Sequence, residues 1–167
     1  VAKRAMQGSD VIEVVEKDGY YKFSTRVESS YRGPEHGNGI IFYPGGKVEE
    51  TAYAPMLLKL AEQGYEVYLV KMPAKLAIFG MNAAEDIMEK AEHMKEWTMM
   101  GHSLGGAMAA SFSASHDAEV DQLVLLAAYS TEDLKDKEIE VFSFYGTEDK
   151  VVNNDNLSAG YSLMPEK

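Results

Sequence analysis

The feature that most constrains the fold of this 167-residue chain is a series of five short apolar segments separated by longer amphipathic ones. Short segments that are apolar on both faces are typical of strands buried in a parallel sheet. The segments between them carry apolar residues at helical spacing. Because parallel strands need crossover connections, this alternation predicts an α/β fold, a mainly parallel sheet with helices on both faces. The predicted strands are residues 39–43, 66–70, 97–100, 122–128 and 140–145. The predicted helices are residues 51–62, 82–95, a segment after residue 103, and one that begins near residue 154.

Turn and capping residues define the ends of two predicted elements. Lys17-Asp18-Gly19 separates two β-rich segments, residues 11–16 and 20–27, so we expect an N-terminal antiparallel hairpin before the parallel sheet. Asn82 precedes an amphipathic helix and Glu85 follows three residues later, a spacing typical of a capping box. We therefore expect the Asn82 side chain to cap that helix, with Glu85 reaching back.

The composition is that of an ordinary globular protein. Apolar residues make up 46% and charged residues 26% of the sequence, and at this length we expect residues 1–167 to form a single domain. The sequence contains no cysteine, which excludes disulfides, thiolate metal ligands and a cysteine nucleophile. We expect neither a metal nor a cofactor.

The charge and the two ends of the sequence bear on partners and location. A formal net charge of −11 would repel a phosphate backbone, so we expect no nucleic-acid partner. No apolar run approaches the roughly 20 residues that cross a bilayer, so we expect no membrane contact by this chain. The sequence starts at Val1 and stops at Lys167, just after a predicted helix, and we expect both ends to be truncated. The location is then cytoplasmic or, if an anchor or signal was removed, extracytoplasmic.

Gly101-His102-Ser103-Leu104-Gly105 matches the G-x-S-x-G pattern of a nucleophile elbow, and it lies between a predicted strand and a predicted helix of small residues. A sharp strand-to-helix turn needs glycine on both sides because a Cβ would clash, and it exposes the central side chain at the helix N-terminus. The helix dipole and free N–H groups there would favour a developing anion. Ser103 is therefore the candidate nucleophile. The alternative is a serine that only caps the helix.

Two further segments end at the same predicted edge of the sheet. Pro44-Gly45-Gly46 follows a strand, where a backbone N–H could face a developing oxyanion, so we predict the N–H groups of Gly46 and Leu104 as oxyanion donors. Taken alone, the glycine pair would indicate only a turn. Asp149 follows the last predicted strand and is the candidate acid that would orient a histidine. Asp133 is the competing acid.

The chain resembles the α/β-hydrolase superfamily, and within it a small bacterial group of dienelactone-hydrolase-like serine hydrolases, in residues 42–49, 67–73, 101–109 and 145–149. The resemblance covers nearly the whole chain from Gly39 onward. It implies an α/β-hydrolase fold and a nucleophile, an acid and a histidine in that chain order, acting on esters or related acyl compounds. It assigns these roles to Ser103 and Asp149, with Gly46 and Leu104 at the oxyanion hole. Dienelactone hydrolases proper use a cysteine, which this sequence lacks.

The sequence has four histidines, and we expect none of them to be the general base. His36 and His93 precede predicted strands and His116 follows the helix after the elbow, so these three should lie at the edge of the sheet opposite Ser103. His102 adjoins Ser103 but points in another direction, so we expect it to pack or hydrogen-bond beneath the turn. In the family the histidine follows one further strand after the acid, so we expect a C-terminal strand and helix to be missing from these residues. The alternatives are a histidine from elsewhere and a non-catalytic relative.

The last expectations concern the substrate. The connection 129–138 is too short for the cap domain that larger hydrolases insert, so the site should be open and shallow. Met72, Leu76, Phe79 and Tyr129 would line it and favour small or medium acyl esters, although each is equally typical of the core. The predicted function is a serine carboxylic-ester hydrolase with a small-molecule substrate. The alternatives are a catalytically inactive binding module, and an acyltransferase or peptidase on the same scaffold. The sequence does not indicate the oligomeric state.

Overall fold

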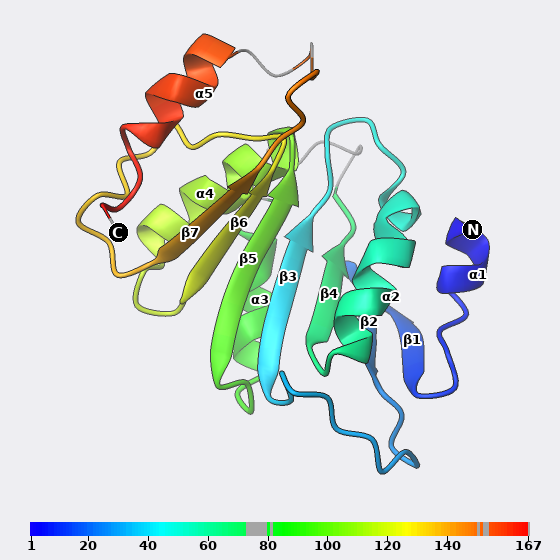
Figure 1. Cartoon of the computed structure of the whole chain (residues 1–167). Coiled ribbons are helices and arrows are strands. Elements are labelled where there is room, and N and C mark those ends of the chain that lie inside the picture. The colour runs from blue at the N-terminus through cyan, green and yellow to red at the C-terminus, as the bar shows by residue number, and fades with distance from the viewer. Residues whose placement is uncertain (73–79, 81, 150, 152–153, 167) are drawn as a thin grey trace.

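The computed structural model describes residues 1–72, 80, 82–149, 151 and 154–166. Within them, one mixed sheet has seven strands in the order β1-β2-β4-β3-β5-β6-β7. The strands are β1 Ile12–Lys17, β2 Tyr20–Thr25, β3 Asn38–Tyr43, β4 Glu66–Val70, β5 Glu96–His102, β6 Gln122–Leu126 and β7 Glu140–Phe144. β3 to β7 are parallel wherever they pair, so their carboxyl ends meet at one edge of the sheet, the upper edge in Figure 1. The predicted mainly parallel sheet is confirmed.

The N-terminal hairpin is also confirmed. β1 and β2 pair antiparallel from Ile12 opposite Thr25 to Lys17 opposite Tyr20, which leaves a two-residue turn. Gly19 in this turn has a φ of 86°, a conformation that glycine adopts without a steric penalty. β2 then pairs antiparallel with β4, so the hairpin extends the parallel sheet at its β4 side.

Helices cover both faces of the sheet, as predicted. They are α1 Ala2–Ala5, α2 Ala54–Glu62, α3 Ala83–Lys90, α4 Leu104–Ser115 and α5 Asn154–Tyr161, and a 3₁₀ turn, η1 Glu50–Tyr53, precedes α2. α1 and α2 bury apolar side chains in one core cluster, and α3 and α4 in a second cluster on the other face (Figure 1). The connection between β6 and β7 contains no helix or strand, so no cap domain is inserted there.

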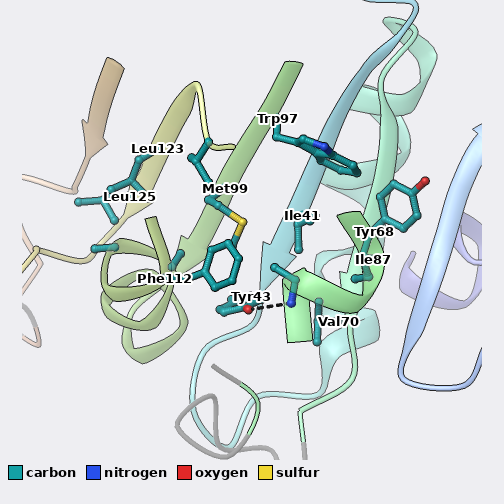
Figure 2. Close-up of a cluster of buried hydrophobic side chains, with 14 of the residues drawn as sticks. Ile41, Tyr43, Tyr68, Val70, Ile87, Trp97, Met99, Phe112, Leu123 and Leu125 are labelled. Carbon is teal, nitrogen blue, oxygen red and sulfur yellow. Dashed lines mark hydrogen bonds between the residues drawn. The ribbon is translucent and has the colours of Figure 1, made fainter. Parts of the chain in front are cut away.

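The cluster beneath α3 and α4 supports the elements that carry the site. Met99 of β5, Phe112 of α4 and Tyr43 at the end of β3 are essentially inaccessible to solvent, and Figure 2 shows their side chains pointing toward one another. The Tyr43 hydroxyl oxygen also accepts a hydrogen bond from the Ala84 N–H at the start of α3, over 3.2 Å. The carboxyl end of β3 is therefore fixed against both helices.

Three local features differ from the sequence predictions. Asn82 precedes α3, but its side chain makes no capping hydrogen bond; its backbone has φ −96° and ψ 12°, outside the extended conformation that directs a capping side chain onto the first turn. α3 ends at Lys90 rather than near residue 95, because Ala91 leaves the helical region with φ −117° and ψ 47°. The short helix α1 was not predicted.

Among the residues that the structure describes, no helix combines the length and apolarity needed to cross a bilayer. Within the same residues, no group of three or more histidine, cysteine or acidic side chains has the arrangement of a metal site.

Candidate active site

Ser103 lies at the sharp turn between β5 and α4, and its backbone is strained. Its φ of 52° and ψ of −124° form a conformation that L-residues rarely adopt, at a cost of about 1–3 kcal/mol. Gly101 and Gly105 make the turn sterically possible. A Cβ on Gly101 would lie 2.5 Å from the Gly105 carbonyl carbon, and a Cβ on Gly105 would lie 2.2 Å from the Pro44 carbonyl oxygen. The turn has the geometry expected of a nucleophile elbow.

Hydrogen bonds fix the turn and leave part of the helix N-terminus open. The Ser103 N–H donates to the Leu126 carbonyl at the end of β6, and the Ser103 carbonyl accepts the Gly106 N–H, both over 2.9 Å. Among the described residues, none accepts a hydrogen bond from the Leu104 N–H. This N–H lies at the start of α4, the positive end of the helix dipole, where negative charge is favoured.

The loop after β3 packs directly against this helix start. The carbonyl oxygens of Tyr43 and Pro44 occupy the space that a Gly105 side chain would need. The loop then turns sharply, because the Val48 N–H donates to the Gly45 carbonyl over 3.3 Å and Lys47 has a φ of 60°. Gly46 is half-buried in this turn, and its N–H donates to none of the described residues. The structure thus brings the Gly46 loop and Leu104 together.

A pocket of about 380 Å³ opens beside Ser103. Its lining comes from the start of α4 and from the loops after β6 and β7, namely Ser103, Leu104, Ala107, Met108, Ala127, Ala128, Tyr129, Thr131 and Val151. The predicted pocket residue Tyr129 is among them, and its hydroxyl accepts a hydrogen bond from the Asn156 side-chain amide over 3.0 Å. Met72 lies instead within the hydrophobic core with 6% of its surface exposed. Leu76 and Phe79 lie outside the described residues.

Both candidate acids follow strands that end at the same edge of the sheet as Ser103. Asp149 is half-buried, and its Oδ1 accepts the Val151 N–H over 2.8 Å. Because Val151 lines the pocket, the Asp149 loop borders the pocket. Asp133 is exposed, and its Oδ1 accepts the Lys135 N–H over 3.1 Å. Both carboxylates therefore stabilise local turns, and both loops reach the pocket, through Val151 for Asp149 and through Thr131 for Asp133. Of the two acids, Asp149 is the more buried.

The four histidines lie where the topology predicts. His36 and His93 line a different pocket, at the amino ends of the parallel strands, and His93 Nε2 lies 3.0 Å from a Glu66 carboxylate oxygen. The His116 ring stacks on Phe112 near the far end of α4, with 3.9 Å between the ring centroids. His102 is held by the hydroxyl of Tyr53, 2.9 Å from its Nδ1. The expectation that His102 bonds beneath the turn is confirmed.

Tyr53 also belongs to this region, although no sequence motif pointed to it. It lies at the end of η1, and its hydroxyl oxygen accepts the Gly45 N–H over 3.0 Å in addition to meeting His102. Burial raises the pKa of Tyr53 above its ordinary value, and the hydrogen bond from Gly45 lowers it in part. The hydroxyl is therefore neutral at physiological pH. Its only sequence-level indication was an apolar stripe along a predicted helix.

A parallel sheet that carries a serine at a strained strand-to-helix turn, beside a pocket at the carboxyl edge, defines an α/β hydrolase. The sequence profile described as "Alpha/beta hydrolase family" matches residues 39–167, and the chain belongs to this family. A predicted CIB-like hydrolase from Thermoplasma acidophilum is similar in structure, with a TM-score of 0.63 and 17% identity over 92% of this chain and 81% of that one. That similarity reflects the fold. Among the curated proteins, none matches this sequence significantly.

Proposed function

We propose that the protein is a serine hydrolase that cleaves carboxylic esters of small or medium acyl groups through an acyl-enzyme on Ser103. The observation that carries the proposal is the strained backbone of Ser103 at the mouth of the 380 Å³ pocket. A side chain that only capped α4 would need no such strain, since an ordinary helix start accepts serine in an extended conformation. Membership of the α/β-hydrolase family supports a hydrolytic activity.

The proposed reaction follows from the groups around Ser103. The serine hydroxyl attacks the ester carbonyl while a base takes its proton, and the carbonyl oxygen becomes an oxyanion. The N–H groups of Gly46 and Leu104, which donate to none of the described residues, are the proposed oxyanion donors. The base then returns this proton to the departing alkoxide, so that the alcohol leaves. The same base takes a proton from water, whose attack releases the acid and restores the Ser103 hydroxyl. The proposal gives none of the four histidines the role of base, because His102 Nδ1 faces Tyr53 and the other three lie at the amino ends of the parallel strands or near the far end of α4.

The pocket lining supports an ester with a modest acyl group. Ala107, Met108 and Val151 are apolar, and a pocket of about 380 Å³ lies near the lower end of ordinary small-molecule sites. With a net charge of −11, the protein would repel a polyanionic substrate. The expected substrate is therefore a small, uncharged or weakly charged ester.

Labelling and turnover test the nucleophile. Ser103→Ala should abolish both covalent modification by a fluorophosphonate and hydrolysis of p-nitrophenyl acetate and butyrate, because the proposal places the acyl-enzyme on the Ser103 oxygen. Ser111→Ala is the matched control, since Ser111 lies on the same helix and its hydroxyl donates to Glu132. Labelling that survives in Ser103→Ala would contradict the assignment of the nucleophile.

The two candidate acids are distinguished by the same assay. We propose Asp149 as the acid, so Asp149→Asn should lower kcat by at least about 100-fold, as expected when a catalytic base loses its orienting carboxylate. Asp133→Asn removes a carboxylate with a similar turn-stabilising bond and should leave kcat within about twofold. The reverse order of effects would assign the role to Asp133.

A catalytically inactive binding module is the second candidate. It is favoured by one observation: among the described residues, each histidine side chain lies away from Ser103. A serine without a base is nearly inert toward a fluorophosphonate. If the wild-type protein shows neither labelling at Ser103 nor turnover above the Ser103→Ala background, the binding module replaces the hydrolase as the proposed function.

A further inference from the structure

The hydroxyl of Tyr53 connects the two sides of the candidate active site. It lies 3.0 Å from the backbone nitrogen of Gly45, in the loop after β3, and 2.9 Å from Nδ1 of His102, the residue immediately before Ser103. Tyr53 lies 8 positions from Gly45 and 49 positions from His102 in sequence, yet the three residues meet around one oxygen atom. We refer to Gly45, Tyr53 and His102 together as the tyrosine bridge.

The directions of the hydrogen bonds follow from the available protons. The Gly45 N–H can only donate, so the tyrosine oxygen accepts that bond. The tyrosine O–H then has one proton to give, and His102 Nδ1 is the other partner within reach. With the tyrosine as donor, His102 Nδ1 is the acceptor, which is the tautomer that has its ring N–H at Nε2.

Packing restricts the tyrosine bridge to one arrangement. The Tyr53 ring lies against Phe42, with ring centroids 4.7 Å apart, and against the His102 ring, with centroids 5.7 Å apart. A Cβ on Gly45 would lie 2.8 Å from His102 Nδ1 and 2.9 Å from the Tyr53 hydroxyl. The tyrosine bridge therefore requires glycine at position 45, because a side chain there would push the Tyr53 and His102 rings away from the loop.

We propose that Tyr53 is a positioning residue, which sets the loop that carries Gly46 relative to the turn that carries Ser103. The inference rests on the proposed hydrolase function of this site. Because the Gly45 N–H is used by Tyr53, the next free N–H along the loop is that of Gly46. The bridge thus determines which amide of the loop faces the oxyanion, and it links that loop to the residue preceding the nucleophile.

Tyr53→Phe in the wild-type sequence is the direct test, since it keeps the ring and removes only the hydroxyl. Oxyanion donors act mainly in the transition state, so a displaced loop should lower kcat for p-nitrophenyl acetate by about tenfold and change KM by less than about twofold. Tyr68→Phe is the matched control. Its hydroxyl donates to Glu66, in a separate part of the core, and its loss should leave kcat unchanged within about twofold.

A spectroscopic measurement tests the bridge independently of catalysis. In the wild-type protein, ¹⁵N shifts of His102 should show a protonated Nε2 and an unprotonated, hydrogen-bonded Nδ1; in Tyr53→Phe the Nδ1 shift should move toward that of a free acceptor. Wild-type shifts with a protonated Nδ1, or a kcat for Tyr53→Phe equal to that of Tyr68→Phe, would overturn the proposal. A wild-type protein with the expected His102 shifts but no turnover would instead refute the proposed function.

Discussion

At the scale of single residues, the most consequential feature is that Ser103 occupies a backbone conformation suited to glycine. With φ 52° and ψ −124°, its Cβ is crowded by the backbone, and the surrounding elements must stabilise the turn against this strain. Because of this strain, the glycine and alanine variants at position 103 should differ in stability in the opposite direction to the same variants of an ordinary helical serine.

Replacing Ser103 by glycine should relieve the strain that alanine retains. We expect Ser103→Gly to be more stable than Ser103→Ala by about 1 kcal/mol, measured by urea unfolding. The same pair of substitutions at Ser111, inside α4, should show the opposite order, because glycine in a helix costs about 1 kcal/mol relative to alanine. If Ser103→Gly is the less stable of its pair, the serine is not strained.

Gly105 permits the close approach of α4 and the loop after β3. A Cβ there would lie 2.2 Å from the Pro44 carbonyl oxygen, so Gly105→Ala must displace one backbone segment. We expect a loss of about 2–4 kcal/mol in the free energy of unfolding. In Gly146→Ala the nearest atom would lie 3.8 Å away, so the change should stay within about 0.5 kcal/mol. Equal losses in the two variants would contradict the close approach.

Some residues of the candidate active site could be predicted from the local sequence, and others could not. The turn at Ser103 was predictable because its cause, glycines two positions away on either side, lies within five residues. The location of His102 beneath the turn followed from the same local geometry. Tyr53 was not predictable, because its partners are brought to it by the packing of η1 against the sheet, and nothing in its own segment specifies them.

At the scale of elements, α3 is fixed to the sheet by a buried hydrogen bond. The Tyr43 hydroxyl accepts the Ala84 N–H, one of the amides that a helix start cannot satisfy internally. Burial raises the pKa of Tyr43 well above its ordinary range, mainly through loss of solvation of the charged form, so the hydroxyl stays neutral. The bond takes the place of the side-chain cap that Asn82 does not provide.

Tyr43→Phe should therefore loosen the start of α3. A buried amide left without an acceptor costs about 1–3 kcal/mol, and hydrogen exchange of the Ala84 amide should accelerate more than that of amides in β3. Tyr20→Phe is the control, because Tyr20 is only half-buried on β2, and its free energy of unfolding should change by less than about 0.5 kcal/mol. Unchanged exchange at Ala84 would show that the hydrogen bond does not hold the helix.

The elements themselves were largely predictable, and their ends less so. Every predicted strand is present, with ends that differ from the prediction by no more than two residues, because short apolar segments have few alternative ways to be buried. The helix at 51–62 begins instead as a 3₁₀ turn, since Pro55 favours the first turn of a helix and α2 starts at Ala54. α1 was missed because four residues carry too little periodicity to recognise.

At the scale of the whole molecule, a partly exposed cluster of charged groups around Glu66 should make the fold sensitive to acid. A carboxylate oxygen of Glu66, at the start of β4, lies 2.6 Å from Lys22 Nζ, and the other lies 3.0 Å from His93 Nε2. The carboxylate also accepts a hydrogen bond from the Tyr68 hydroxyl. Burial acts to raise the pKa of Glu66, but the hydrogen bonds from His93, Lys22 and Tyr68 outweigh it and hold the pKa below its ordinary value.

Glu66 should then stabilise the fold above the ordinary glutamate pKa, and this contribution should disappear as the pH falls through the lower folded-state value. We expect Glu66→Gln to be less stable than wild type near neutral pH and to lose less stability on acidification, measured by urea unfolding from about pH 7 to about pH 3. Glu89→Gln changes the same charge at an exposed site and should parallel the wild type. Parallel curves for Glu66→Gln would contradict the assignment.

The order of the strands was beyond the reach of the sequence pattern. Periodicity distinguishes strands from helices, but it contains no information on which strands pair, and β4 lies between β2 and β3. The resemblance implied the α/β-hydrolase fold, which the family match confirms, and the order of the strands comes from the structure.

Because β2 pairs with β4, the hairpin is synthesised well before the strand that it pairs with. Tyr20 lies opposite Val70, so the hairpin finds its partner only after a long intervening segment, including all of β3, has been synthesised. Hairpins form within microseconds, whereas a ribosome adds roughly 5–20 residues per second. The hairpin therefore waits for seconds with Phe23, fully buried in the finished sheet, still uncovered. During that interval the apolar face of the hairpin has no strand of its own chain to pair with and is open to contact with other chains.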